Sequence, residues 1–392
     1  MTFAQDFSLS AVIAGFVSVL VGFTSAGVIV FQAAQALGAT PVEIGSWIWA
    51  LGLGMGLTSI LLSWRYKMPV VTAWSTPGAA LIIPAAAGVS MSEGVGAFLV
   101  CAALITLCGF TGWFERVMNA IPLTLASAML GGVLLRFGLN VFVAMQTQFV
   151  MTFAMFCVYL LVRQVVSRYT ILAALVVSAV IAGTRGLLTL ETVQWQLAQP
   201  VFTVPQFSIS AIIGIALPLF VVTMASQNVP GVATIRAFGY NTPISPLIGW
   251  TGTATLALAP FGAFAINLAA ITAAITMGRE AHEDEDKRYV AAMAAGVFYI
   301  VVSFLGATVA NLFSALPEEF VLTIAGLALL NTIGKSLAIA LSEEKDREAA
   351  LITFLVTASG MTLLNVGSAF WGIAAGALVV SSHRLVGMKR TT

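Results

Sequence analysis

Long apolar runs separated by short polar connections make up almost the whole of this chain. A membrane-spanning helix needs about 20 apolar residues, and on that basis the 392 residues divide into fourteen predicted spans. The spans lie near residues 10–34, 43–63, 70–88, 94–113, 119–139, 148–163, 169–187, 208–235, 244–261, 264–278, 289–312, 318–340, 347–362 and 366–386. The pattern predicts an all-α polytopic membrane protein.

The chain also contains an internal repeat. The longest polar connection, 188–206, separates seven spans from seven. Residues 36–41 (ALGATP) resemble 237–243 (AFGYNTP), and Ile-Pro, Gly and Leu-Leu in 121–135 recur as Leu-Pro, Gly and Leu-Leu at the same spacing in 316–330. Because seven is odd, the second copy must be inserted upside down. Inverted repeats of this kind are typical of secondary transporters.

The basic residues predict the orientation of the spans. With fourteen spans, nearly all of them fall on connections that share one side of the membrane, and Arg185 is the exception. Lys and Arg gather on cytoplasmic loops, so both termini are expected in the cytoplasm. The first ten residues lack Lys and Arg, and so lack the basic start of a cleaved signal peptide; the first run is expected to be a retained span.

The third span, within residues 69–84 (PVVTAWSTPGAALIIP), does not resemble a simple helix. Val70 to Thr72 are β-branched and favour an extended backbone. Ser75-Thr76-Pro77 then provides an N-cap hydroxyl and a proline at the start of a helix. The residues predict a short strand followed by a half-helix whose N-terminus suits an anion. An ordinary helix with proline in its first turn is the alternative.

The repeat predicts a counterpart in the tenth span, residues 258–277 (LAPFGAFAINLAAITAAITM). Pro260 and Gly262 interrupt this span, and residues 261–266 are short enough to be extended. Asn267 is a suitable N-cap for a helix that continues through Leu268. We therefore expect two half-helices, beginning at Thr76 and Asn267, to face each other from opposite leaflets.

Three consecutive polar residues, Ser226, Gln227 and Asn228, lie inside the eighth span just before Pro230. Polar groups at membrane depth need partners and usually face the bundle interior or a cavity. They are candidates for substrate contact, with helix–helix hydrogen bonding as the alternative. Ser25 and Gln32 are the candidates in the equivalent region of the first span. For Lys335, within the twelfth span, snorkelling to the interface is the default expectation.

Composition excludes several classes of function. The chain is 59% hydrophobic and 8% charged, whereas soluble domains are typically about 25% charged. A net charge of +1 offers no basis for nucleic-acid binding, and the three cysteines form no metal-binding pattern. All acidic residues fall at termini, span ends or loops, so no carboxylate relay or catalytic pair is predicted. We expect neither an enzyme, nor a cofactor, nor a metal site.

Several segments resemble the BenE family of benzoate/proton symporters. They are TAWSTPGAALI (72–82), LPLFVVTMASQNVPG (217–231), SPLIG (245–249), FLVTASGMTL (354–363) and GSAFWG (367–372). That family is similar in architecture to nucleobase–ascorbate and anion transporters, with fourteen spans in two inverted repeats. The resemblance implies a core domain (1–116 and 201–314) that moves against a gate domain (117–200 and 315–392), a bacterial inner-membrane location, and an architecture that allows a homodimer through the gate.

The resemblance implies that the chain imports benzoate or a related aromatic carboxylate in symport with protons. Another anion, or an anion channel, is the alternative. The predicted substrate-binding residues are Ser25, Gln32, Trp74, Ser75, Thr76, Pro77, Gly78, Ser226, Gln227, Asn228, Ile266 and Asn267. One departure matters: nucleobase carriers of this architecture have glutamates near Ser226 and near Ile266 or Asn267. Their absence argues against a nucleobase substrate and leaves the proton-carrying group unassigned.

Overall fold

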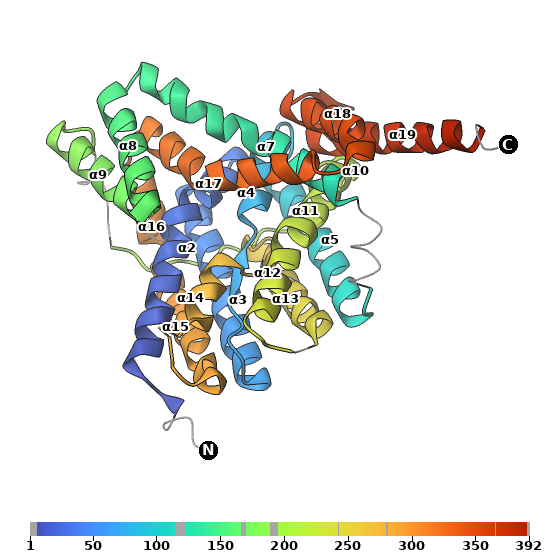
Figure 1. Ribbon diagram of the computed structural model, residues 1–392. Coiled ribbons are helices and arrows are strands. Elements are labelled where there is room, and N and C mark those ends of the chain that lie inside the picture. The colour runs from blue at the N-terminus through green and yellow to red at the C-terminus, as the bar shows by residue number, and fades with distance from the viewer. Residues whose placement is uncertain are drawn as a thin grey trace.

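A computed structural model describes residues 6–113, 122–165, 170–188, 195–241, 243–279, 281–364 and 366–389, and it is mostly helical (Figure 1). The helices of the first half are α2 (Leu9–Ala36), α3 (Pro41–Tyr66), α4 (Thr76–Ala85), α5 (Met91–Phe110), α7 (Leu123–Val143), α8 (Phe149–Val165) and α9 (Thr170–Thr184). Those of the second half are α10 (Ile209–Ala211), α11 (Leu217–Thr223), α12 (Val229–Ala237), α13 (Ile244–Leu258), α14 (Ile271–Met277), α15 (Tyr289–Phe304), α16 (Gly306–Ser314), α17 (Glu318–Ala340), α18 (Arg347–Ala358) and α19 (Ser368–Lys389).

Short elements interrupt these helices at particular places. Two π-helical turns, Ile212–Ala216 and Met224–Asn228, lie before and after α11. The described part of the chain also contains two antiparallel strand pairs, β1 (Thr72–Trp74) with β2 (Ile266–Leu268) and β3 (Thr362–Leu363) with β4 (Val366–Gly367), and four short 3-10 turns. The first pair lies where the sequence predicts interrupted third and tenth spans.

Six described helical stretches are long and apolar enough to cross a membrane, or seven if the bent pair Leu9–Phe23 and Ala26–Ala36 forms one span. Shorter apolar helices, α4 among them, do not meet that length on their own. The chain is therefore a helical membrane protein with several spans. The count of fourteen stays a prediction.

The most extensive helix–helix contacts each join one helix of the first half of the chain to one helix of the second half. Helix α3 packs along α15, and α13 packs along α5, while α7 packs along α17. In the predicted repeat, α3 corresponds to α13 and α5 to α15, so the first two contacts are the same contact with the halves interchanged. This pairing is what a two-fold relation between the halves requires.

Glycines allow the backbones of these pairs to approach closely. A Cβ placed on Gly56 of α3 would lie 2.7 Å from the Gly296 carbonyl oxygen of α15, and a Cβ on Gly296 would lie 2.7 Å from that of Gly56. In the other pair, a Cβ on Gly109 would lie 2.2 Å from the backbone nitrogen of Gly249. Small residues at interfaces are the usual means of packing helices in a membrane, where close contact replaces the hydrophobic effect.

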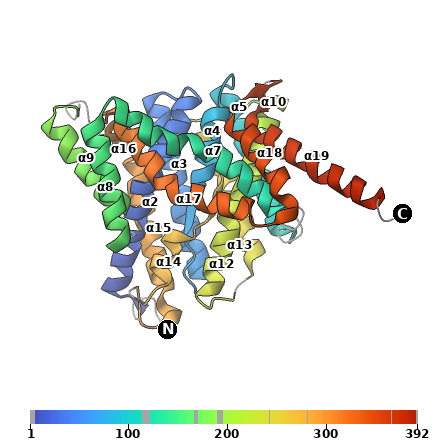
Figure 2. The same ribbon diagram turned by 45° about the horizontal axis from the view of Figure 1, so that its top comes forward.

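Helices of the predicted gate domain gather on one side of the molecule. Helices α7, α8, α9, α17, α18 and α19 contact one another and lie along the upper part of Figure 1, with the predicted core helices below them. Turning the molecule shows α8 and α9 beside α2, and α19 extending outward to the C-terminus (Figure 2). The division into two domains stays a prediction.

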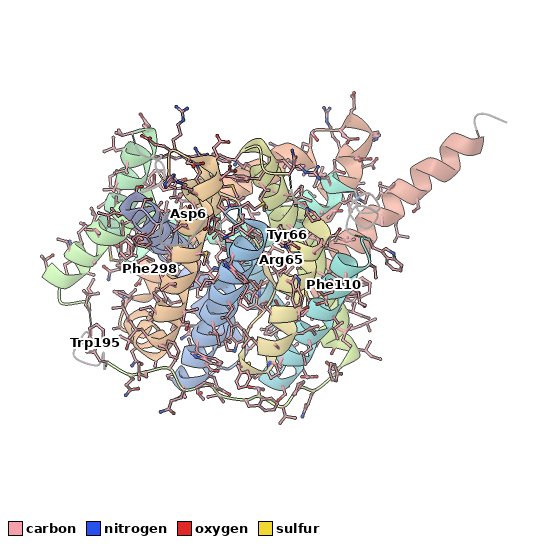
Figure 3. The ribbon with its side chains drawn as sticks, turned by 90° about the horizontal axis from the view of Figure 1, so that it is seen from below. Asp6, Arg65, Tyr66, Phe110, Trp195 and Phe298 are labelled. Carbon is pink, nitrogen blue, oxygen red and sulfur yellow. The ribbon has the colours of Figure 1, made fainter. Side chains whose placement is uncertain are left out.

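The connection between the halves is extended where it is described. Residues 195–207 cross the ends of α3, α5 and α15 as a strap, and Figure 3 shows Trp195 away from Asp6 and from Arg65 and Tyr66 at the end of α3. Five backbone N–H groups of the strap donate hydrogen bonds to the bundle, from Gln196 to Thr308, Ala198 to Phe304, Val201 to Ser46, Thr203 to Pro260 and Gln206 to Ser92.

Candidate functional site

The site is organised by the β1–β2 pair, which joins the two halves of the chain inside the bundle. Ala73 lies opposite Asn267, and Trp74 lies opposite Ile266. All three residues of β2 are fully buried. Non-helical backbone at this depth is tolerated only where its polar groups are satisfied by protein or face a water-filled cavity, and the pairing satisfies part of that requirement.

Hydroxyl groups of α3 hold β1 in place. The Thr72 N–H donates to Ser59 Oγ at 3.0 Å, and the Thr72 hydroxyl donates to the Met55 carbonyl at 2.9 Å. One turn closer to the end of α3, Ser63 Oγ accepts from the Val70 N–H at 3.0 Å. These bonds take the place of a third strand, so β1 stays extended without a larger sheet.

The N-terminus of α4 follows β1 directly and opens toward a cavity. Ser75 is its N-cap: Ser75 Oγ accepts from the Gly78 N–H at 3.1 Å and from the Thr223 hydroxyl at 3.0 Å. Pro77 has no N–H. Neither the N–H nor the hydroxyl of Thr76 bonds to another described residue. Thr76 is half-buried, and it leaves two donors at the positive end of a ten-residue helix with no acidic residue in its first turn.

The prediction that Asn267 caps the second half-helix is wrong. Asn267 lies in the middle of β2, and α14 begins only at Ile271, after Ala270, with no side-chain cap. The backbone stays extended through Leu268 because it pairs with Thr72, so the helix starts later than the N-cap pattern predicts. The Asn267 Nδ2 donates to the Ala265 carbonyl at 3.0 Å, and Oδ1 is buried without a hydrogen-bond partner among the described residues.

The polar triplet of the eighth span forms a π-helical turn, Met224–Asn228, a distortion that is common at functional sites. The turn sends neighbouring side chains to different places. Asn228 is fully buried and braces β2, because its Oδ1 accepts from the Leu268 N–H at 3.0 Å. Ser226 Oγ donates to the Val222 carbonyl of its own helix, and the Gln227 amide makes no hydrogen bond to a described residue.

A cavity of about 310 Å³ lies between these elements and the helices α7 and α17. Typical small-molecule sites measure roughly 300–1,000 Å³. Its wall combines aromatic and apolar groups with a few polar ones, and the chemically distinctive members are Trp74, Thr76, Ser226, Gln227, Tyr299 and Lys335. Trp74 packs edge to face against Phe23, with ring centroids 4.8 Å apart.

A second cavity, of about 360 Å³, adjoins the first and shares Thr76, Gln227 and Asn331 with it. Arg163 lines this second space; its guanidinium donates to the Tyr159 hydroxyl at 2.9 Å and to Asn331 Oδ1 at 3.3 Å. Among the described residues that line either cavity there is no Asp, Glu or His. The lining is therefore neutral to positive, which suits an anion.

Of the remaining predicted substrate-binding residues, some line a cavity and others do not. Pro77 lines the second cavity, whereas Gly78 packs against Leu219, and a Cβ there would lie 2.5 Å from Leu219 Cδ1. Gln32 lines neither cavity, although its Oε1 is buried without a partner among the described residues. Ile266 is buried in β2. The side chain of Ser25 lies outside the part of the chain that the structure describes.

Sequence reasoning missed the contribution of the gate helix α17. Asn331, Thr332, Lys335 and Ser336 all line the first cavity. Their spacing of i, i+1, i+4 and i+5 places them on one helix face, and this periodicity within an apolar span is the signal that could have identified them.

Comparison with known sequences identifies a family. The model of the BenE family, described as benzoate membrane transport protein, matches residues 5–381. The chain is 47% identical over 364 residues to the inner membrane protein YdcO of Escherichia coli (strain K12), covering 93% of each chain. It is 41% identical over 377 residues to a benzoate membrane transport protein of Acinetobacter baylyi (strain ATCC 33305 / BD413 / ADP1), covering 96% of each.

Solved structures share the fold at low sequence identity. The structure of SLC26A9 matches with a TM-score of 0.61 and 14% identity, covering 100% of this chain and 68% of that one. The transmembrane domain of the cyanobacterial bicarbonate transporter BicA matches with a TM-score of 0.58 and 12% identity, covering 94% of this chain and 97% of that one.

Proposed function

Because this chain belongs to the BenE family of benzoate membrane transport proteins, a family of transporters and not of enzymes, we propose that it imports benzoate or a related aromatic carboxylate together with protons. The observation that carries the proposal is the cavity at the start of α4. Thr76 and Gln227 present donors that bond to no other described residue, and no carboxylate among the described lining residues opposes an anion.

The cavity wall favours an aromatic anion over a small inorganic one. Trp74, Tyr299 and Met55 form apolar surface beside the polar end. Aromatic rings prefer edge-to-face or offset contacts with one another, and an apolar wall does not replace the hydration shell of an inorganic ion. The carboxylate is placed at Thr76 and Gln227, with the ring against Trp74. Another anion, or a channel of the same fold, is the alternative, since the low-identity structural neighbours include a bicarbonate transporter.

We place the transport movement between the predicted core and gate domains. The cavity is walled by Leu123 and Ser127 at the start of α7 and by Lys335 and Ile339 near the end of α17, the helix ends that the charge pattern predicts to be cytoplasmic. Beyond the other end of α4, near Pro84, the cavity between α4, α7 and α18 measures about 20 Å³. The described conformation is therefore interpreted as facing inward, and a shift of core against gate would expose the same site outward.

Proton coupling proceeds in this proposal without a carboxylate at the site. Glu43 and Glu93, at the starts of α3 and α5, each accept hydrogen bonds from the N-cap residue of their own helix. The proton travels on the substrate carboxylate or through water in the cavity.

The orientation of the chain can be tested independently of transport. We place both termini in the cytoplasm of a bacterial inner membrane. A reporter fused after Thr392 or inserted near Asp284 is expected on the cytoplasmic side, and one inserted near Gln196 on the external side. If the Asp284 and Gln196 sites report from one side, the fourteen-span topology is wrong.

Uptake into proteoliposomes tests the proposed function. The purified chain is reconstituted and offered benzoate, substituted benzoates, benzamide, sulfate and bicarbonate, with and without an imposed inward proton gradient. Saturable benzoate uptake above equilibrium, dependent on the gradient, is expected. Uptake that never exceeds equilibrium would indicate a channel, and preference for an inorganic ion would replace the substrate assignment.

A further inference from the structure

Lys335 is a charged residue at the wall of the transport cavity. It lies on α17 and lines the same cavity of about 310 Å³ as Thr76 and Gln227, and the other described lining residues are uncharged. A charge within a membrane helix is costly and usually marks a substrate or ion pathway. Snorkelling to the membrane surface explains a lysine that points outward from the bundle, whereas Lys335 lines this cavity between the predicted core and gate helices.

The Lys335 ammonium has no counter-ion in the described part of the chain. It forms no ion pair or hydrogen bond with another described residue, and its side chain is exposed rather than packed. The other nearby cation, Arg163, differs because its guanidinium is already bonded to Tyr159 and Asn331. Of the two, Lys335 is the cation still open to an anionic partner.

We propose that Lys335 is the counter-ion of the substrate carboxylate on the gate side of the cavity, an inference that rests on the proposed function. Thr76 and Gln227 supply neutral donors from the core, and Lys335 supplies the positive charge from the gate. A carboxylate between them contacts both domains at once. Hydrogen bonds between ionised partners are roughly twice as strong as neutral ones, so Lys335 sets the preference for an anion over a neutral molecule of the same shape.

Affinity measurements on the full-length purified protein in detergent test this assignment. The ligands are benzoate and benzamide, which share a ring and differ in charge, and binding is followed by isothermal titration calorimetry. The variants are Lys335→Met, Lys335→Gln as a second neutral replacement, and Lys335→Arg, which retains the charge. Lys345→Met is the matched control. Lys345 is an exposed lysine in the connection that follows α17, and its ammonium pairs with Glu343 at 2.9 Å.

Removal of the charge is expected to weaken benzoate binding about tenfold, the effect of losing one charge-assisted contact. Benzamide binding should change little, so the preference for benzoate over benzamide falls by about the same factor. Lys335→Arg should keep most of the preference, and Lys345→Met should match the unaltered protein.

Two results would separate failure of this inference from failure of the proposed function. If the unaltered protein binds benzoate and both neutral variants bind it equally well while remaining folded by thermal unfolding, Lys335 is not the counter-ion. If the unaltered protein prefers another anion of the uptake panel, the substrate assignment fails, and loss of that anion's binding in Lys335→Met still supports Lys335. Binding of no anion overturns both.

Discussion

The two strand–helix units, β1–α4 and β2–α14, occupy corresponding places in the predicted repeat but differ in chemistry. Helix α4 has ten residues, a side-chain cap from Ser75 and unbonded donors on Thr76. Helix α14 has seven residues and begins at Ile271, after Ala270, without a side-chain cap. The strand β2 is fully buried and the second unit lines the cavity through residues 269–272, whereas β1 lines it through Ala73 and Trp74.

The comparison indicates that two copies of a predicted repeat can share a backbone geometry while one copy carries the recognition chemistry. The strands pair with each other, so both halves need the same extended geometry. Anion binding needs unsatisfied donors. In the second unit the Asn267 amide donates to the Ala265 carbonyl, and Asn228 of the eighth span holds the strand by accepting from the Leu268 N–H. We therefore expect the first unit to dominate binding and the second to dominate stability.

The largest expected effect is from a negative charge at the start of α4. Thr76→Asp should weaken benzoate binding relative to Thr76→Asn, whose side chain has the shape of Asp without the charge. Two like charges about 4 Å apart repel by roughly 1–4 kcal/mol, which corresponds to about fivefold to thousandfold in affinity. The Asp-to-Asn difference should be smaller at Ala270. Calorimetric affinities measure both differences, and an equal or larger effect at Ala270 would break the asymmetry.

The next effect concerns the brace on the second strand. Asn228→Ala removes the acceptor of the buried Leu268 N–H, and an unsatisfied buried donor costs about 1–3 kcal/mol of stability. Thermal unfolding in detergent should show a clear loss. Ser226→Ala is the control, since its hydroxyl bonds only within its own helix, and it should unfold close to the unaltered protein. Similar losses for both would show that Asn228 is not a brace.

The caps give a smaller, paired effect. Ser75→Ala removes the N-cap of α4, which typically costs about 0.5–2 kcal/mol of stability. Ala270→Ser should not give a corresponding gain, because Ala270 has helical backbone angles (φ −106°, ψ −59°) rather than the extended conformation of a capping residue. A stabilised Ala270→Ser protein would show that α14 accepts a cap after all.

The smallest effect is expected at helix starts remote from the cavity. Helices α3 and α5 begin with capping boxes that include Glu43 and Glu93, so their N-termini carry their own carboxylates, unlike that of α4. Glu43→Gln and Glu93→Gln should leave proton-driven benzoate accumulation unchanged in proteoliposomes. Retained exchange with lost accumulation in either variant would identify that glutamate as the proton carrier.

Local sequence patterns were enough to predict the membrane class and the first strand–helix unit, while the inverted repeat stays a prediction. Long apolar runs indicate a chain that folds in a lipid bilayer, because polar and charged groups are costly there and membrane spans must therefore be mostly apolar. The β-branched residues before Ser75-Thr76-Pro77 act locally, through backbone preference and capping, so the start of α4 at Thr76 could be predicted from neighbouring residues alone.

Contacts between distant parts of the chain determine where the second unit begins and where individual polar side chains lie. Asn267 has the local signature of an N-cap, but pairing of β2 with β1 extends the strand through Leu268 and delays α14 to Ile271. Asn228 and Gln227 are neighbours in sequence, yet a π-helical turn sends one to β2 and the other to the cavity. Lys335 has the position of an interfacial anchor in the sequence, but the fold places it at the cavity that Thr76 of α4 also lines. In each case the deciding partner is distant in the chain, and local preference cannot anticipate a contact that only folding creates.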